Sequence, residues 1–332
     1  MNVAERNYNL DYIKGVAILM VIVFHCLMSY SMKFGGIFYI EQAVPLFLIV
    51  SAYLVFEKLK LKTSSGYFDK KIFLKVVKRI FVPFIIFEIV IVLISLVKHN
   101  FSVFGFIISG GIGMGSYYPW LYLQYWLLLP FLFSLLIKFN KWGGVILIFG
   151  TIICSVLFYS IVYLIGHRSI VDAVWRLFIG KYIFTAYIAW LLLEIFFKLK
   201  YYFPLIIMGI AYMFMHRYKI VNLQPWFYTT EAFPWNGVNF PTYYYSGLLF
   251  FVMYKLLPKF NTGIKKILQF LGQNSWEIFL GQMLFFAILP PRNSPIMALL
   301  TIPLAIGFSM IAAYLYILCT EKWSISFRKN RL

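Results

Sequence analysis

Apolar runs long enough to cross a lipid bilayer recur along nearly the whole chain, and this pattern limits what the chain can fold into. Of its 332 residues, 62% are hydrophobic and only 12% are charged, whereas roughly a quarter of the residues in soluble domains are charged. A transmembrane helix needs about 20 apolar residues, and lipid offers no partner to an unpaired backbone group. The alternating pattern of a transmembrane barrel is absent. We therefore expect an all-α polytopic membrane protein.

The number and direction of the helices follow from the apolar runs and the charges between them. The expected spans are ten, at 10–31, 38–57, 78–98, 119–138, 143–165, 174–197, 202–216, 242–257, 267–289 and 294–319. Most lysines and arginines then fall in the loops on the side of the N-terminus, so the positive-inside rule predicts that both termini are cytoplasmic. The net charge of +19 is explained by this topology rather than by nucleic-acid binding.

The sequence also predicts the domain organisation and the state of the cysteines. We expect one integral-membrane domain over residues 1–332, with no soluble domain, in the plasma or inner membrane of a bacterial cell. The first span has no cleavage-site pattern after it, so we expect it to be retained. The three cysteines are far apart and lie in apolar runs, which predicts neither a disulfide nor a metal site.

One titratable residue, His25, lies deep in the first span. The stretch Leu10–Cys26 is otherwise apolar apart from Asp11 and Lys14 near its start. Ionisable groups inside a bilayer are costly, so such a residue is a candidate functional group. On a helix, His25 lies within about 20° of Lys14 around the axis and about 16 Å further along it. One face of this helix therefore carries charge at the membrane surface and an imidazole inside the membrane.

Five segments resemble, in the right order, motifs of the integral-membrane acyltransferase family 3. The first helix of that family carries a basic residue, ten intervening residues and a histidine, which Lys14 and His25 match. The other four segments are VPLFLIVSAYL (44–54), KVVKRIFVPF (75–84), PWLYLQYWLLLP (119–130) and LGQNSWEIFLGQ (271–282). The resemblance covers about 270 residues and implies a membrane O-acyltransferase that modifies glycans, with acetyl as the expected acyl group. The late motif of the family commonly ends in histidine, whereas this chain has Gln282.

The chemistry of acyl transfer suits His25 independently of the resemblance. Moving an acyl group from a thioester to a hydroxyl requires removal of the hydroxyl proton, and an imidazole is suited to that base role. Glu41, expected at a similar depth, is a candidate to orient the ring by accepting its second N–H. The alternative for His25 is a histidine that joins helices by a hydrogen bond. Gln282 cannot titrate, and it either contacts the acceptor or packs between helices.

Basic residues near the cytoplasmic surface are candidates to bind the phosphates of an acyl-CoA donor, with acetyl-CoA the expected one. The candidates are Lys14 and the group Lys75, Lys78 and Arg79, where the resemblance places a donor-binding basic pair. The alternatives are an interfacial anchor paired with Asp11, for Lys14, and contact with anionic lipid headgroups, for the other three. No permanently bound cofactor is expected.

Two long outer loops are also expected. The loop near 217–241 carries Trp226, Glu231 and Trp235, which could contact a cell-surface glycan or a lipid-linked glycan precursor; the alternative is an interfacial aromatic belt. The glycine-rich loop near 99–118 either re-enters the membrane or lies on its surface. Glu88 and Glu277 lie within the expected spans, and their carboxylates are expected to pair with buried basic groups.

The residues and the resemblance together predict a membrane O-acyltransferase with His25 as its general base. A polysaccharide or lipid-linked sugar transporter or flippase is the first alternative, and a membrane sensor or scaffold the second. The chain has no detectable repeat of the kind that many transporters show.

Overall fold

Every regular element that the structure describes is a helix, as the sequence predicts. The structure is a computed structural model, and it describes residues 6–28, 30, 35–61, 70–165, 174, 177–195, 203–218, 240–291 and 294–329. The α-helices are α1 (Tyr8–Cys26), α2 (Ala43–Lys60), α3 (Lys70–Val97), α4 (Val103–Ser109), α5 (Tyr118–Phe139), α6 (Lys141–Ile165), α8 (Phe184–Ile195), α9 (Phe203–Tyr218), α10 (Phe240–Leu256), α11 (Thr262–Gln273), α12 (Ser275–Ile288) and α13 (Pro295–Lys329). Short 3₁₀ turns lie at η1 (Gly36–Phe38), η2 (Ile40–Gln42), η3 (Ile179–Tyr182) and η5 (Leu257–Lys259).

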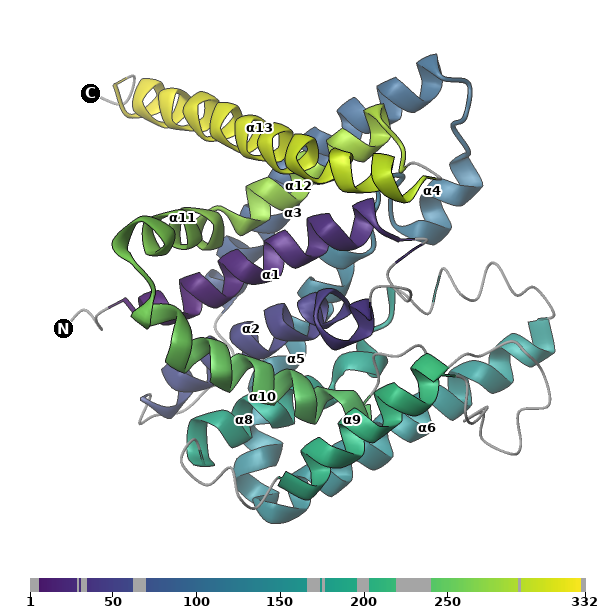
Figure 1. Cartoon of the computed structure of the whole chain (residues 1–332), viewed down its shortest axis with the longest axis vertical. Coiled ribbons are helices and arrows are strands. Elements are labelled where there is room, and N and C mark those ends of the chain that lie inside the picture. The colour runs from purple at the N-terminus through teal and green to yellow at the C-terminus, as the bar shows by residue number, and fades with distance from the viewer. Residues whose placement is uncertain are drawn as a thin grey trace.

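Five helical stretches in the described ranges are long and apolar enough to cross a membrane. They are Tyr8–Cys26, Ile40–Lys60, Lys70–Val97, Tyr118–Phe139 and Pro295–Thr320. Three shorter apolar helices accompany them, at Trp142–Cys154, Phe203–Phe214 and Ser275–Ile288. The chain is thus an integral-membrane protein, while the total of ten spans stays a prediction. The start of α1 and the end of α13 lie on the same side of the bundle (Figure 1).

The expected span 267–289 is wrong in one respect, because two helices occupy this range. α11 ends at Gln273 and α12 begins at Ser275. Asn274 lies between them, and its side-chain amide donates a hydrogen bond to the carbonyl of Phe270 at 2.8 Å. Its own carbonyl then accepts from the N–H of Ile278 to begin the next helix. A side chain that competes for backbone groups can end a helix within an apolar run.

Helix α1 occupies the middle of the fold, with α2 and α11 beside it (Figure 1). Two glycines allow the backbones of α1 and α11 to touch. A β-carbon on Gly15 would lie 2.3 Å from the carbonyl oxygen of Leu268, and one on Gly272 would lie 1.8 Å from that of Asp11. Small residues permit this kind of close approach between membrane helices. The contact brings the α11–α12 break next to the charged start of α1.

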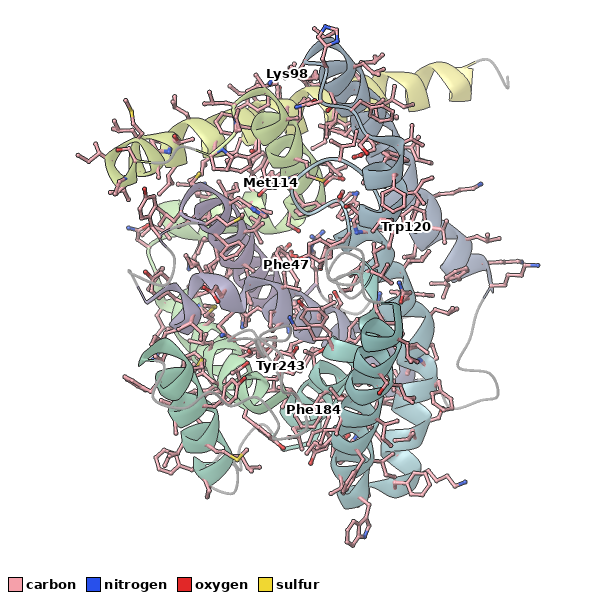
Figure 2. The ribbon with its side chains drawn as sticks, turned by 90° about the vertical axis from the view of Figure 1, so that its right-hand side faces the viewer. Phe47, Lys98, Met114, Trp120, Phe184 and Tyr243 are labelled. Atoms are coloured by element: carbon pink, nitrogen blue, oxygen red, sulfur yellow. The ribbon has the colours of Figure 1, made fainter. Side chains whose placement is uncertain are left out.

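The aromatic part of the molecule lies on the other side of α2, around α8 and α10. Its buried polar side chains pair with one another: the Tyr125 hydroxyl is 2.8 Å from that of Thr185, and Tyr243 donates to the carbonyl of Lys181 at 3.0 Å. Figure 2 shows Tyr243 and Phe184 in this lower region, away from Phe47 and Met114. The pairing satisfies groups that would otherwise be costly to bury.

Candidate active site

The start of α1 carries a compact group of charges. Asn7 caps the helix by accepting a hydrogen bond from the N–H of Asn9 at 3.2 Å. The buried carboxylate of Asp11 then accepts from Arg6 through one oxygen and from Lys14 through the other, each at 2.8 Å. The pairing of Asp11 with Lys14 is the one expected for an interfacial anchor. Two cations around one carboxylate leave this end of α1 with a net positive charge.

His25 lies in the last turn of the same helix and is half-buried. Its ring contacts those of Phe24 and Phe286, with centroids 5.4 and 5.9 Å away. The Nδ1 atom is buried and has no hydrogen-bond partner in the described part of the chain. The Nε2 atom faces Gly115, where an added β-carbon would lie 4.0 Å away. The two ring nitrogens therefore have different surroundings.

A cavity of about 310 Å³ connects His25 with the charged end of α1. From α1 it is lined by Lys14 and His25, which lie about 16 Å apart along the helix. From α2 it is lined along almost the whole helix, from Val44 to Lys58. The remaining wall comes from α3, α5, Gly115 and the α11–α12 break. One elongated space therefore borders both the imidazole and the basic residues.

Among the described residues, three cations line this cavity: Lys14, Lys58 and Arg79. Because α2 returns across the bundle after α1, Lys58 near its end lies toward the start of α1. Of the predicted basic group, Arg79 is among the lining residues, whereas Lys75 and Lys78 are exposed on α3 and are not. Lys58 is a site residue that the sequence did not predict, because its position near a run of lysines gives no sign that this exposed residue borders the cavity.

The predicted role of Glu41 finds no support in the geometry. Glu41 belongs to η2 and does not line the cavity, and His25 Nδ1 makes no hydrogen bond to it. The physical reason is that Glu41 precedes α2 in a 3₁₀ turn, so helical depth did not fix where its side chain points. The orienting contact that a catalytic triad would need is not formed.

Gln282 and Glu88 both bind the glycine-rich loop instead. The amide of Gln282 donates to the carbonyl of Met114 at 3.2 Å, and a carboxylate oxygen of Glu88 accepts from the N–H of Ile112. Both side chains are buried, at 0% and 5% exposed. The expectation that Glu88 pairs with a basic group is therefore wrong. Its partner is backbone, which only the folded loop could supply.

The loop after α4 packs between helices rather than over them. Alternate glycines approach two of them, α3 and α12: an added β-carbon would lie 2.7 Å from Glu88 at Gly111, 2.7 Å from Met283 at Gly113 and 2.8 Å from Phe279 at Gly115. Gly110, Gly111 and Gly115 also have positive φ angles of 70°, 139° and 92°, which glycine adopts readily. The loop is therefore held against α3 and α12.

The lysine after α3 also fixes the site. Lys98 donates hydrogen bonds to the carbonyls of Ala287 and Ile288, at 2.7 and 2.8 Å. These are orphan carbonyls at the end of α12, where a cation is favourable. The contact, near the upper edge of Figure 2, holds the end of α3 against the helix that carries Gln282.

The predicted glycan-contacting residues Trp226, Glu231 and Trp235 lie outside the described residues. Within the described ranges, no group of three His, Cys, Asp or Glu side chains could hold a metal ion.

The comparison with protein families agrees with the motifs in the sequence. The family model described as Acyltransferase domain, that of acyltransferase family 3, matches residues 7–318. Neither the curated proteins nor the solved structures gave a match. The matched region holds both ends of the cavity and nearly the whole chain. The chain therefore belongs to acyltransferase family 3 and is a membrane acyltransferase.

Proposed function

We propose that this protein is a membrane O-acyltransferase that moves an acetyl group from acetyl-CoA to a hydroxyl of a cell-surface glycan or its lipid-linked precursor. His25 is the general base of the reaction. The donor enters from the cytoplasmic side and the acceptor from the outer side, in the plasma membrane of a bacterial cell.

The observation that carries this proposal is the single cavity shared by His25 and the three cations. Coenzyme A carries its phosphates at one end and its thioester at the end of an extended arm. Lys14, Lys58 and Arg79 border one region of the cavity. The imidazole borders the other, about 16 Å along α1. An elongated anionic donor fits these two requirements together.

The chemistry follows from the position of His25 Nε2. The acceptor hydroxyl donates its proton to Nε2 as its oxygen attacks the thioester carbonyl carbon. The carbon–sulfur bond then breaks, and the sulfur of coenzyme A takes up the proton from Nε2. A base within hydrogen-bond reach contributes typically 10²–10⁴-fold to such reactions. The apolar walls formed by Val21, Phe47 and Phe279 keep water from competing with the acceptor.

The basic residues divide into two kinds. Lys14 is anchored by Asp11, so its ammonium group is held in place and partly neutralised. Arg79 presents a guanidinium, which can bind a phosphate through two N–H groups at once. Lys75 and Lys78, exposed beside it, remain proposed donor contacts at the mouth of the cavity. The outer loop with Trp226, Glu231 and Trp235, which lies outside the described residues, remains the proposed acceptor side.

The test uses membrane vesicles of the source cell that lack the native protein and contain either the wild type or His25→Gln. Radiolabelled acetyl-CoA is added outside inverted vesicles, and both free thiol and label in the glycan fraction are measured. We expect the wild type to release coenzyme A and to label the glycan. The variant should show both activities at no more than about one-thousandth of the wild-type rate.

Two outcomes would overturn the proposal. Full labelling by a folded His25→Gln protein would remove the histidine as base. Glycan movement across the membrane without release of coenzyme A would identify a transporter instead. Thermal unfolding in detergent establishes that the variant is folded.

A further inference from the structure

The glycine segment (residues 110–116) reaches the middle of the site and offers unused backbone donors there. Its residue Gly115 lies against His25 Nε2 and borders the cavity. In the described part of the chain, the N–H groups of Gly113, Met114 and Gly115 donate to no acceptor. Backbone N–H groups are seldom left unpaired in a packed interior. These three residues are half-buried, and Gly115 among them borders the cavity beside His25 Nε2, so their unpaired N–H groups call for an explanation.

The segment is fixed at several points. Glu88 holds it from α3 through the N–H of Ile112, and Gln282 holds it from α12 through the carbonyl of Met114. The indole N–H of Trp120 donates to the carbonyl of Gly110 at 2.8 Å from α5. Contacts from α3, α5 and α12 therefore fix the backbone that carries the unpaired N–H groups. Ordered donors of this kind can act without reorganising during a reaction.

Side chains would not fit where the segment passes the helices. A β-carbon on Gly113 would lie 2.7 Å from the terminal carbon of Met283, and one on Gly115 would lie 2.8 Å from the ring of Phe279. The glycines thus allow the backbone itself, rather than a side chain, to approach His25. This close approach of backbone is the usual structural use of glycine at a reacting centre.

We propose that the N–H groups of Gly113–Gly115 form the oxyanion hole of this acyltransferase and that Glu88 and Gln282 are the positioning residues that hold it. This inference rests on the proposed acyl transfer. As the acceptor oxygen bonds to the thioester carbon and its proton passes to His25, the carbonyl oxygen becomes an oxyanion, which the amides stabilise. When the carbon–sulfur bond breaks, the carbonyl is restored and the sulfur takes the proton from His25.

The role of the clamps can be tested with side chains of similar length. Glu88→Met and Gln282→Met remove one hydrogen bond to the segment each, whereas Glu88→Gln keeps an oxygen that can accept from Ile112. Misplacing a catalytic group by about 1 Å can cost about 100-fold in rate. We expect both Met variants to lower kcat by about 10- to 100-fold with the KM for acetyl-CoA within about twofold of wild type. Glu88→Gln is expected to restore most of kcat.

Two further measurements separate positioning from mere structural damage. Hydrogen exchange of residues 110–116 should quicken in the Met variants and stay slow in Glu88→Gln, because only the former release the segment. In the Met variants, kcat should be lower at every pH while the midpoint of its pH profile stays at the wild-type value, because His25 is unchanged. Gly113→Ala, which strains the segment, should lower kcat, whereas Gly307→Ala is the matched control because no atom lies within 4 Å of its added carbon.

The outcomes distinguish this inference from the proposed function. If His25→Gln is inactive while both Met variants and Gly113→Ala keep wild-type kcat, the oxyanion hole is overturned and the acyltransferase stands. If His25→Gln is fully active, the proposed base fails first. Should Glu88→Met not fold, Gln282→Met and Gly113→Ala decide the question in the same way.

Discussion

The two halves of the bundle treat their buried polar groups in opposite ways. Around α8 and α10 they are paired: Tyr125 with Thr185, and Ser246 with Gln42 at 2.6 Å. Around α1, α3 and α12 several are paired through only one of their polar atoms or through none. Among the described residues, the buried side-chain atoms without a hydrogen-bond partner are His25 Nδ1, Glu88 Oε2, Trp276 Nε1, Glu277 Oε2 and Gln282 Oε1, and all lie on these three helices.

We interpret the paired groups as stabilising the fold and the unpaired groups as serving the reaction. A paired buried group stabilises the fold by about 1 kcal/mol, while an unpaired one costs about 1–3 kcal/mol and persists only where something else requires it. Of the residues with an unpaired atom, His25 and Trp276 line the cavity, and Glu88 and Gln282 hold the glycine-rich loop. We therefore expect substitutions around the cavity to change the kinetics of acyl transfer, and substitutions around α8 and α10 to change thermal stability alone.

The largest expected effect is on the backbone contact that holds the cavity half together. In Gly272→Ala the new carbon would lie 1.8 Å from the carbonyl oxygen of Asp11, where only backbone could move to relieve the clash. Overpacking costs typically 1–3 kcal/mol, occasionally more, and we expect this backbone clash to exceed that range. Gel filtration in detergent should show loss of the monodisperse protein. A variant as stable as Gly307→Ala would show that α1 and α11 can separate freely.

The second effect concerns the donor end of the cavity. Arg79→Ala removes a cation from the cavity wall, and a hydrogen bond to a charged group is worth about 1.5–3 kcal/mol. Because Arg79 is exposed, we expect the smaller part of that range, an increase of about 10-fold in the KM for acetyl-CoA with kcat nearly unchanged. Steady-state kinetics measures it.

Lys138→Ala is the matched control for that experiment, since Lys138 is an exposed cation that does not line the cavity. Equal KM values in the two variants would mean that net charge, rather than a specific contact, attracts the donor. Lys75 is an exposed neighbour of Arg79 on α3. Lys75→Ala should therefore raise the KM for acetyl-CoA by less than Arg79→Ala does and by more than Lys138→Ala does.

The aromatic half should respond in stability alone. Ser246→Ala removes the donor to Gln42 and leaves a buried acceptor unpaired, which costs about 1–3 kcal/mol. Thermal unfolding should shift downward while kcat and both KM values stay within about twofold of wild type. A large loss of kcat in a folded Ser246→Ala protein would contradict the assignment of this pair to stability alone.

The smallest expected effect is at the surface pair of Lys60 and Glu194. Their charged atoms lie 2.8 Å apart, but the side chains are 53% and 36% exposed. Exposed pairs typically contribute about 0.2–1 kcal/mol and are screened by salt. Glu194→Gln should therefore lower stability by less than about 1 kcal/mol at low salt and by nothing measurable at about 1 M salt.

Much of the fold could be predicted because lipid restricts the choices. The apolar runs predicted helices, and α1, α2, α3, α5 and α13 are long enough to span. The break at Asn274 could not be predicted, because composition alone does not reveal when a side chain will take the backbone bonds of a helix. The packing of the glycine-rich loop against α3 and α12 could not be predicted for a similar reason, because its residues are equally suited to a surface.

The candidate site divides in the same way. Lys14 and His25 could be predicted to share a face, because helical periodicity relates residues on one helix. Lys58, Arg79 and Gly115 reach the same cavity from three other elements, and no local pattern relates them to His25. For Glu41 and Glu88, depth in the membrane suggested partners that the fold did not supply.

The sequence by itself determined that this chain forms membrane helices, that one of them carries an imidazole and a cation on a common face, and that its motifs are those of acyltransferase family 3. Hydrophobicity and helical period are local properties, so they can be read from neighbouring residues. Only the tertiary structure decided which cations share the cavity and that Glu88 and Gln282 hold the glycine segment beside His25. Those contacts join residues far apart in the chain, and they exist only after the helices have packed.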